Sequence, residues 1–238
     1  MNGRSERRLL EGPAGRIELV LDRPPARAVG VVFIAHPHPL FGGSLDNKVV
    51  TTLARAFSAL GWLAVRPNFR GVGASEGTYD EGHGESDDLL HLVDLVPRMP
   101  DVAAWLPERA PRALAGFSFG SFVAARVARE LQQRGQPARH LVLVGAAAGK
   151  WPMPAVDADA IVIHGERDET IALSDVFEWA RSSDIAVTVI PGADHFFHRR
   201  LTLLKRLVVK SLAGSEAERG LAAGTAAQTA AGEPAEAQ

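Results

Sequence analysis

The stretch Ala113-Leu-Ala-Gly-Phe-Ser-Phe-Gly120 decides the fold of this chain. An apolar run leads into Gly116, and an amphipathic helical pattern over residues 123–131 follows Gly120. Gly-x-Ser-x-Gly at such a junction predicts a sharp turn from a strand into a helix, because glycines let the two elements approach closely. Ser118 would sit at that turn, with its hydroxyl raised above the edge of a sheet.

Apolar runs typical of strands recur on both sides of this stretch. Residues 29–35 form a continuous β-branched run, as expected for a strand that is covered on both faces in a parallel sheet. The other predicted strands span residues 16–21, 62–65, 112–116, 140–144, 160–163 and 186–190. Between most of them, apolar residues recur at helical spacing. This alternation predicts the α/β class: a doubly wound, mostly parallel sheet flanked by helices, with functional loops at the carboxyl ends of the strands.

The length of 238 residues suits a single domain. We predict that this domain spans residues 16–213 and that a polar N-terminal segment, residues 1–15, precedes it. Residues 214–238 are mostly Ala, Gly, Glu and Gln, with hardly any large apolar residue. This composition predicts a mobile tail that joins no core, and a short Ala-rich surface helix is the alternative.

The charge balance and the absence of cysteine limit the possible functions. The chain has 26 Lys and Arg against 28 Asp and Glu, so no basic field favours a nucleic-acid partner. Because there is no cysteine, disulfides, thiolate metal sites and a cysteine nucleophile are excluded. No secretory signal and no run of about 18 apolar residues is readable, so we expect a cytoplasmic protein with no membrane partner.

Ser118 needs a neighbouring base, since a free serine hydroxyl is a weak nucleophile. His195 follows a predicted strand and a Pro-Gly turn, and Asp168 follows the end of the strand before it. Both would leave the sheet on the same edge as Ser118, in the chain order Ser, Asp, His that a strand–helix turn of this kind predicts. We therefore predict a catalytic triad in which His195 is the base and Asp168 orients it.

Other residues compete for two of these roles. Glu166 and Glu169 flank Asp168 and could replace it, and His198 could replace His195. His164, at a strand end, is expected to be a packed, hydrogen-bonded histidine instead. Asp194 is expected to have a surface or capping role.

The loop His36-Pro-His-Pro-Leu-Phe-Gly-Gly43 follows the first buried strand. Its two prolines lack backbone donors, so past His36 only His38 and Leu40 can offer an inward N–H in its first part. An acyl-transfer site needs such donors to stabilise an oxyanion. We predict an oxyanion hole made by the backbone N–H groups of Phe119 and His38, with Leu40 as the alternative to His38.

The histidines of this loop do not predict a metal site. His36 and His38 have no thiolate and no obvious carboxylate partner, and two histidines alone do not complete a tetrahedral site. We expect a packed His36 side chain that stiffens the loop, and neither a metal nor a cofactor. Leu40 and Phe117 are predicted to contact the substrate.

A glycine-rich loop at residues 66–76 would border the same site. No Lys-Ser/Thr pair follows its glycines, so it is not a phosphate-binding P-loop, and a structural turn is expected. Its Arg70 is expected to pair with a carboxylate such as Glu76 or Asp80.

Taken together, these segments resemble the α/β-hydrolase superfamily, and within it a group of small, lidless bacterial serine hydrolases similar to dienelactone hydrolase. The similar segments are HPHPLFGGSLDNKVV (36–50), RPNFRGVGASEG (66–77), GFSFGSF (116–122), HGERDE (164–169) and PGADHFFH (191–198). The resemblance implies Ser118, Asp168 and His195 as the triad and the N–H groups of Phe119 and His38 as the oxyanion hole. The chain departs from many relatives in the prolines of its first loop, where they carry His-Gly.

The sequence also predicts an open site and an acyl substrate. Residues 145–159, between two predicted strands, are too few for a helical cap. We expect hydrolysis of a small-molecule acyl bond, most simply a carboxylic ester, through an acyl-enzyme. The alternatives are a thioesterase or peptidase with the same triad, a perhydrolase or acyltransferase, and a non-catalytic binding or regulatory protein on the same fold.

Overall fold

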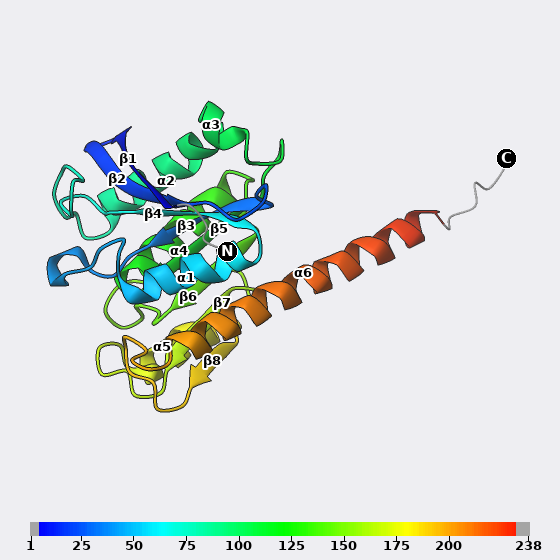
Figure 1. The fold of residues 1–238 in the computed structure, drawn as a ribbon. Coiled ribbons are helices and arrows are strands. Elements are labelled where there is room, and N and C mark those ends of the chain that lie inside the picture. Colours follow the sequence, from blue (N-terminus) through cyan, green and yellow to red (C-terminus); the bar gives the residue numbers. More distant parts are fainter. Residues whose placement is uncertain (1–4, 232–238) are drawn as a thin grey trace.

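The computed structural model describes residues 5–231, with side chains described as far as Arg219. Its centre is an eight-stranded sheet in the order β1-β2-β4-β3-β5-β6-β7-β8 (Figure 1). The strands are β1 (Ser5–Gly12), β2 (Gly15–Asp22), β3 (Gly30–Ala35), β4 (Trp62–Pro67), β5 (Arg112–Phe117), β6 (His140–Val144), β7 (Ile161–Gly165) and β8 (Val187–Ile190). β2 pairs antiparallel with both β1 and β4, and the other six strands run parallel. The predicted mostly parallel sheet is confirmed.

Helices cover both faces of this sheet, as the doubly wound prediction requires. α1 (Lys48–Ala59) and α6 (Leu201–Ala231) pack together, and their apolar residues join one core cluster. α2 (His83–Leu95), α4 (Phe119–Gln133) and α5 (Leu173–Ser182) contribute to a second cluster on the opposite face. Three short elements complete the fold: η1 (Pro39–Phe41), η2 (Val96–Arg98) and α3 (Pro100–Ala103).

The burial of the central strands explains why the sequence contains short, continuous apolar runs. All six residues of β3 are buried, because helices lie on both of its faces and β4 and β5 lie on either side. Ala35 pairs with Gly116 in the parallel register of β3 and β5. The loop of residues 36–43, which follows β3, and the Gly-x-Ser-x-Gly turn, which follows β5, therefore leave the sheet at the same edge.

The N-terminal segment differs from its prediction. Residues 5–12 of the predicted polar segment 1–15 form β1, which pairs with β2 along its whole length. Its residues alternate between exposed and half-buried, and charged side chains occur on both faces: Arg7 and Glu11 are exposed, whereas Glu6 and Arg8 are half-buried. Arg8, for example, pairs with Glu6 and with Asp101 of α3. Charged side chains on an edge strand hide the apolar signal by which strands are recognised.

The C-terminal segment also differs from the expected tail. α6 continues through residues 214–231, which corresponds to the helical alternative, and residues 232–238 lie outside the described part. Figure 1 shows α6 leading away from the sheet. The Glu216 carboxylate accepts hydrogen bonds from Arg139 at 2.9 and 2.6 Å, and its Oε1 lies 2.6 Å from Nε2 of His140, so the helix still contacts the body there. The mobility of this segment stays a prediction.

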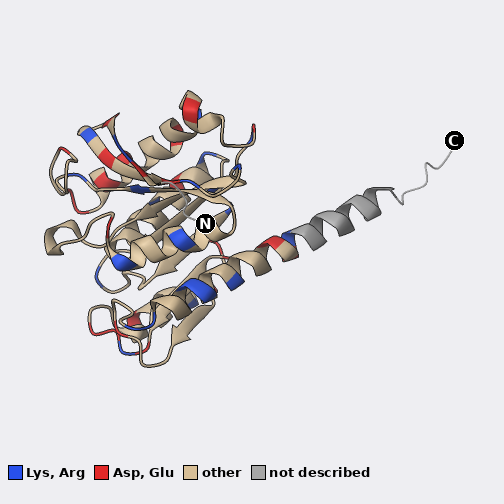
Figure 2. Ribbon diagram, in the orientation of Figure 1, with Lys and Arg blue, Asp and Glu red and all other residues tan. Residues whose placement is uncertain are grey.

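Along the ribbon of the described residues, Lys and Arg positions are interspersed with Asp and Glu positions (Figure 2). Among the same residues, no helix has the length and apolarity needed to cross a membrane. β6 ends at Val144 and β7 begins at Ile161, and the segment between them contains no helix. The expected absence of a lid is confirmed.

Candidate active site

Ser118 lies in the turn between β5 and α4 with a strained backbone, at φ 54° and ψ −124°. The two motif glycines make this turn possible. A Cβ on Gly116 would lie 2.1 Å from the carbonyl oxygen of Gly120, and one on Gly120 would lie 2.3 Å from that of Ala35. The strand, the helix and the neighbouring β3 are thus too close for any side chain at either position. The packing requires the spacing that the sequence motif shows.

The structure brings the three predicted triad side chains into one hydrogen-bonded chain. Nδ1 of His195 lies 2.7 Å from Oδ2 of Asp168, and Nε2 of His195 lies 2.9 Å from Oγ of Ser118. All three side chains are buried. An acceptor at Asp168 fixes the proton of His195 on Nδ1, so Nε2 is free to accept the hydroxyl proton of Ser118.

Asp168 is held by the backbone of its own loop. Its Oδ1 accepts hydrogen bonds from the N–H groups of Thr170, at 2.9 Å, and Ile171, at 2.8 Å. Burial alone would raise the pKa of Asp168, but the hydrogen bonds from His195 and from the Ile171 N–H outweigh it and hold the pKa below its ordinary value. The carboxylate is therefore charged when it faces the imidazole.

The His164 side chain lies next to the Asp168 carboxylate. Its Nε2 is 3.1 Å from the carbonyl oxygen of Ile171 and 3.3 Å from Oδ2 of Asp168. Burial lowers the pKa of His164, which favours the neutral ring. The side chain is packed and hydrogen-bonded, as expected from its position at the end of β7, and it supports the Ile171 turn.

Two of the competing residues, Glu166 and His198, make other contacts, whereas Glu169 lines the cavity beside Ser118. Glu166 accepts a hydrogen bond from the Gly192 N–H at 2.7 Å, so it holds the turn after β8. His198 is exposed, and its Nδ1 lies 2.6 Å from Oδ2 of Asp194. Asp194 also accepts from the His198 N–H at 3.0 Å, which fits its expected capping role. Neither Glu166 nor His198 contacts the Ser118–His195 pair through a hydrogen bond.

The first loop is stiffened by His36. This ring is fully buried; its Nδ1 lies 2.6 Å from the Pro37 carbonyl oxygen, and its Nε2 accepts the Phe69 N–H at 2.9 Å. Both ring nitrogens are thus bonded to backbone groups, which leaves neither for a metal. Burial lowers the pKa of His36 to about 4.

Two of the predicted substrate contacts are not found at the cavity. Leu40 is 67 % exposed and does not line it, and the Leu40 N–H is directed to Nδ1 of His38, at 3.2 Å. Phe117 is fully buried, with its ring 5.0 Å from that of His195. Phe117 precedes the turn and packs in the core beside the imidazole, whereas Leu40 is exposed in η1.

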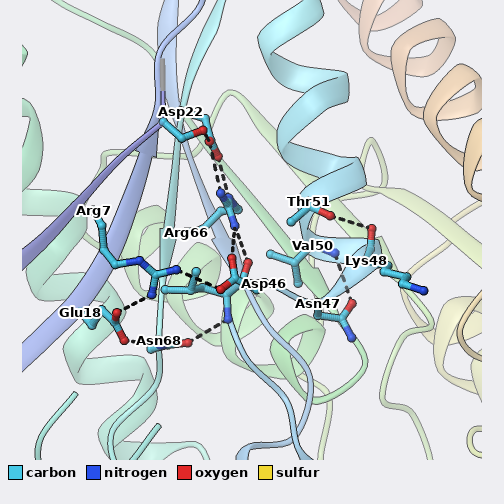
Figure 3. Close-up of polar contacts among 12 residues, drawn as sticks. Arg7, Glu18, Asp22, Asp46, Asn47, Lys48, Val50, Thr51, Arg66 and Asn68 are labelled. Atoms are coloured by element: carbon cyan, nitrogen blue, oxygen red, sulfur yellow. Dashed lines mark hydrogen bonds and ion pairs between the residues drawn. The ribbon is translucent and has the colours of Figure 1, made fainter. Parts of the chain in front are cut away.

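A polar network that the sequence pattern does not reveal holds the residues just after the loop 36–43 (Figure 3). Asn68 Oδ1 accepts the Leu45 N–H at 2.8 Å, and Arg66 Nη1 donates to the Leu45 carbonyl oxygen at 2.5 Å. Asn68 Nδ2 donates to Glu18 at 2.7 Å, and Arg66 makes a two-pronged pair with Asp22 at 2.6 and 3.2 Å. Both backbone groups of Leu45 are therefore held by side chains from the end of β4. The only sequence signal is that polar residues directly follow a buried strand.

Arg70 pairs with a carboxylate, as expected, but its hydrogen-bonded partner is neither of the two examples named from the sequence. Its Nε and Nη2 donate to the two carboxylate oxygens of Asp88 on α2, at 2.9 and 2.8 Å. Asp80 is 4.0 Å away, and Glu76 pairs instead with Arg16. The helix that follows the loop supplies the carboxylate, which proximity in sequence does not reveal.

Ser118 and His195 open into a cavity of about 390 Å³. Its other lining residues are Pro37, His38, Phe41, Gly42, Gly43, Asn47, Lys150, Trp151, Glu169, Thr170, Ile171 and Phe196. They come from the loop before α1, the β6–β7 segment and the loops after β7 and β8. Within the described residues, no group of three or more His, Asp or Glu could hold a metal ion.

Comparisons with known proteins agree with this architecture. The family model of the thioesterase domain matches residues 77–190. An α/β serine hydrolase without a lid, from Xanthomonas campestris, is 33 % identical, with a TM-score of 0.78 over 87 % of this chain and 93 % of that one. An α/β serine hydrolase homologue from Coxiella burnetii is 37 % identical, with a TM-score of 0.76 over 87 % and 97 %.

A dienelactone hydrolase from Anabaena variabilis shares the fold at 17 % identity, with a TM-score of 0.71 over 90 % of this chain and 99 % of that one. Three observations support one assignment: the sheet order, the absence of a lid, and sequence identities above 30 % to the Xanthomonas and Coxiella structures. The chain belongs to the α/β-hydrolase superfamily and to its lidless serine hydrolases.

Proposed function

We propose that this hydrolase cleaves carboxylic esters of small molecules through an acyl-enzyme on Ser118. One observation carries the proposal: the unbroken hydrogen-bonded chain from Asp168 through His195 to the Ser118 hydroxyl, which opens into a cavity. Such a chain raises the nucleophilicity of a serine that would otherwise be unreactive.

Each group has a defined part in the reaction. As Ser118 Oγ attacks the ester carbonyl carbon, His195 Nε2 takes the hydroxyl proton, and the charged Asp168 stabilises the imidazolium. When the tetrahedral intermediate collapses, the same proton passes to the leaving alcohol. Water then attacks the acyl-enzyme with His195 again as the base, which releases the acid and restores Ser118.

The oxyanion is proposed to accept hydrogen bonds from the N–H groups of Phe119 and His38. Phe119 begins α4, and the first N–H groups of a helix have no acceptor within it. Within the described part of the chain neither N–H has a protein acceptor. The Leu40 N–H is bonded to His38, which supports His38 over Leu40 as the second donor.

A thioester is the second candidate substrate, because the thioesterase-domain family model matches residues 77–190, which include Ser118 and Asp168. The same triad would serve both reactions, with a thiol as the leaving group. Hydrolysis of matched p-nitrophenyl and thiol esters of the same acid, compared by kcat/KM, separates the two.

The proposal is tested by steady-state hydrolysis of p-nitrophenyl acetate. Ser118→Ala is expected to lose roughly 10⁴- to 10⁶-fold in kcat, as other triads do when the nucleophile is removed. Ser174→Ala, a substitution of an exposed serine on α5, is the matched control and should retain wild-type kcat. Equal activity of the Ser118→Ala protein would refute the assignment.

A further inference from the structure

Two exposed phenylalanine side chains line the cavity that holds Ser118. Within the described residues, the large hydrophobic side chains left exposed are Leu9, Val29, Leu40, Phe41, Phe177 and Phe196. Phe41 and Phe196 line the cavity that holds Ser118, and Leu40 is the neighbour of Phe41. An apolar patch beside a reactive group indicates contact with an apolar ligand more than chance exposure does.

Phe41 is presented to solvent by a well-ordered turn. It is 85 % exposed, yet the turn is closed by hydrogen bonds from the N–H groups of Phe41 and Gly43 to the His38 carbonyl oxygen, at 3.2 and 3.0 Å. The Phe41 ring packs 4.6 Å from the His38 ring. The fold therefore holds this phenyl group in water beside the site, where it covers no part of the core.

Phe196 bounds the cavity beside the imidazole. It follows His195 directly, is 47 % exposed, and its ring lies edge-on at 5.1 Å from the His195 ring. The next residue, Phe197, is fully buried and fixes the chain on its other side. Because Phe41 and Phe196 belong to separate loops that line one cavity, an apolar group that extends outward from Ser118 can contact both.

The rest of the lining favours a neutral chain over a charged one. Trp151 and Ile171 add apolar surface. Among the described residues that line the cavity, the Lys, Arg, Asp and Glu residues are Lys150 and Glu169, and their charges are opposite. Their fields partly cancel, so neither sign of substrate charge is favoured.

We infer that the acyl group taken by this site carries an aliphatic chain longer than acetyl, which extends out of the cavity along Phe41 and Phe196. This inference rests on the proposed function, since it names the substrate class of the same Ser118 site. An acetyl group would end inside the cavity and leave both phenyl rings in water, whereas a longer chain removes their faces from water as it binds.

The first test is a chain-length series of p-nitrophenyl acetate, butyrate, hexanoate and octanoate, each used below its micelle concentration. Wild-type kcat/KM is expected to rise by about tenfold or more from acetate to octanoate, since several methylenes become partly buried. A flat or falling series would overturn the inference. If instead the protein hydrolyses none of the esters and Ser118 takes no acyl group, the proposed function itself fails.

The second test uses variants with a matched control. Phe41→Ala and Phe196→Ala should each lower the ratio of kcat/KM for octanoate to that for acetate by about fivefold to tenfold, and Phe41→Leu should restore much of it. Phe177 on α5 is also exposed, at 41 %, but does not line the cavity, so Phe177→Ala should keep the wild-type ratio. An unchanged ratio in both cavity variants would overturn the inference, and far-UV circular dichroism checks that each variant is folded.

Discussion

Ser118 occupies a backbone conformation that most residues avoid. Its φ of 54° with ψ of −124° costs on the order of 1–3 kcal/mol, and such strain persists only where neighbours enforce it. The Ser118 N–H donates to the Val144 carbonyl oxygen at 3.0 Å, and Ser121 Oγ donates to the Ser118 carbonyl oxygen at 2.6 Å. These bonds fix the serine backbone from both sides, which keeps its hydroxyl within 2.9 Å of His195.

Gly120→Ala tests whether close packing sets this turn. The new Cβ would lie 2.3 Å from the Ala35 carbonyl oxygen, so β3 and α4 must separate, and the free energy of unfolding should fall by about 3 kcal/mol. Gly214→Ala in α6, where nothing lies within 4 Å, is the control and should be neutral or slightly stabilising. Urea unfolding measures both, and equal stability of the two variants would contradict the packing argument.

Asp168→Asn should lower kcat by about 10⁴-fold, because an amide no longer holds the His195 proton on Nδ1 or stabilises the imidazolium. Glu166→Gln is the natural comparison, since Glu166 competes for the role in the sequence but binds the Gly192 N–H. Its kcat should stay within about threefold of wild type. Steady-state ester hydrolysis measures both variants, and a larger loss in Glu166→Gln than in Asp168→Asn would reverse the assignment.

His36 makes stability depend on pH. Burial lowers its pKa to about 4, whereas an unfolded histidine has a pKa of about 6.5. Between these values the unfolded chain binds the additional proton, so this contribution to the free energy of unfolding is complete above pH 6.5 and is lost as pH falls toward 4. At pH 5 the loss attributable to His36 should be about 2 kcal/mol.

The check compares urea midpoints at pH 5 and pH 8 for the wild type and for His36→Asn. The variant is expected to start from a lower stability at both pH values, but its change between them should be smaller by about 2 kcal/mol. An identical change in the two proteins would show that His36 is not buried in its neutral form.

Among the helices and strands, the sequence predicts those whose apolar pattern lies within a single segment. β3 and α4 are recognisable because each carries its apolar pattern within one segment. β1 is not, because an edge strand alternates charged residues that pair with distant partners such as Asp101. The hydrogen-bonded cluster of Ser118, Asp168 and His195 was predictable because its members follow strand ends in a fixed chain order. The Asn68–Leu45 bond was not, because it depends on where two separate loops meet.

Asn68→Ala tests the network that holds the first loop. It leaves the buried Leu45 N–H without an acceptor and removes a donor from Glu18, so stability should fall by about 2 kcal/mol. Because the same loop carries His38, kcat for ester hydrolysis should fall as well. Gln132→Ala, which removes an exposed amide bonded to Asp157, is the control and should change neither quantity measurably.

At the scale of the whole molecule, the site exists only when the sheet is complete. Ser118, Asp168 and His195 follow β5, β7 and β8, and Ser118 and His195 are 77 positions apart in the chain. The parallel order of these strands brings three separate loops to one edge (Figure 1). The proposed reactivity of Ser118 would therefore depend on the folded molecule and not on the Gly-x-Ser-x-Gly segment alone.

The most direct measurement is labelling with a fluorophosphonate probe, followed by mass-spectrometric mapping of the modified peptide. One label, on Ser118, is expected in the folded protein, with the rate of labelling greatly reduced in His195→Ala and in the urea-unfolded chain. A folded protein that takes no label on Ser118, or that labels Ser118 equally fast without His195, would contradict the claim that these residues form a working triad.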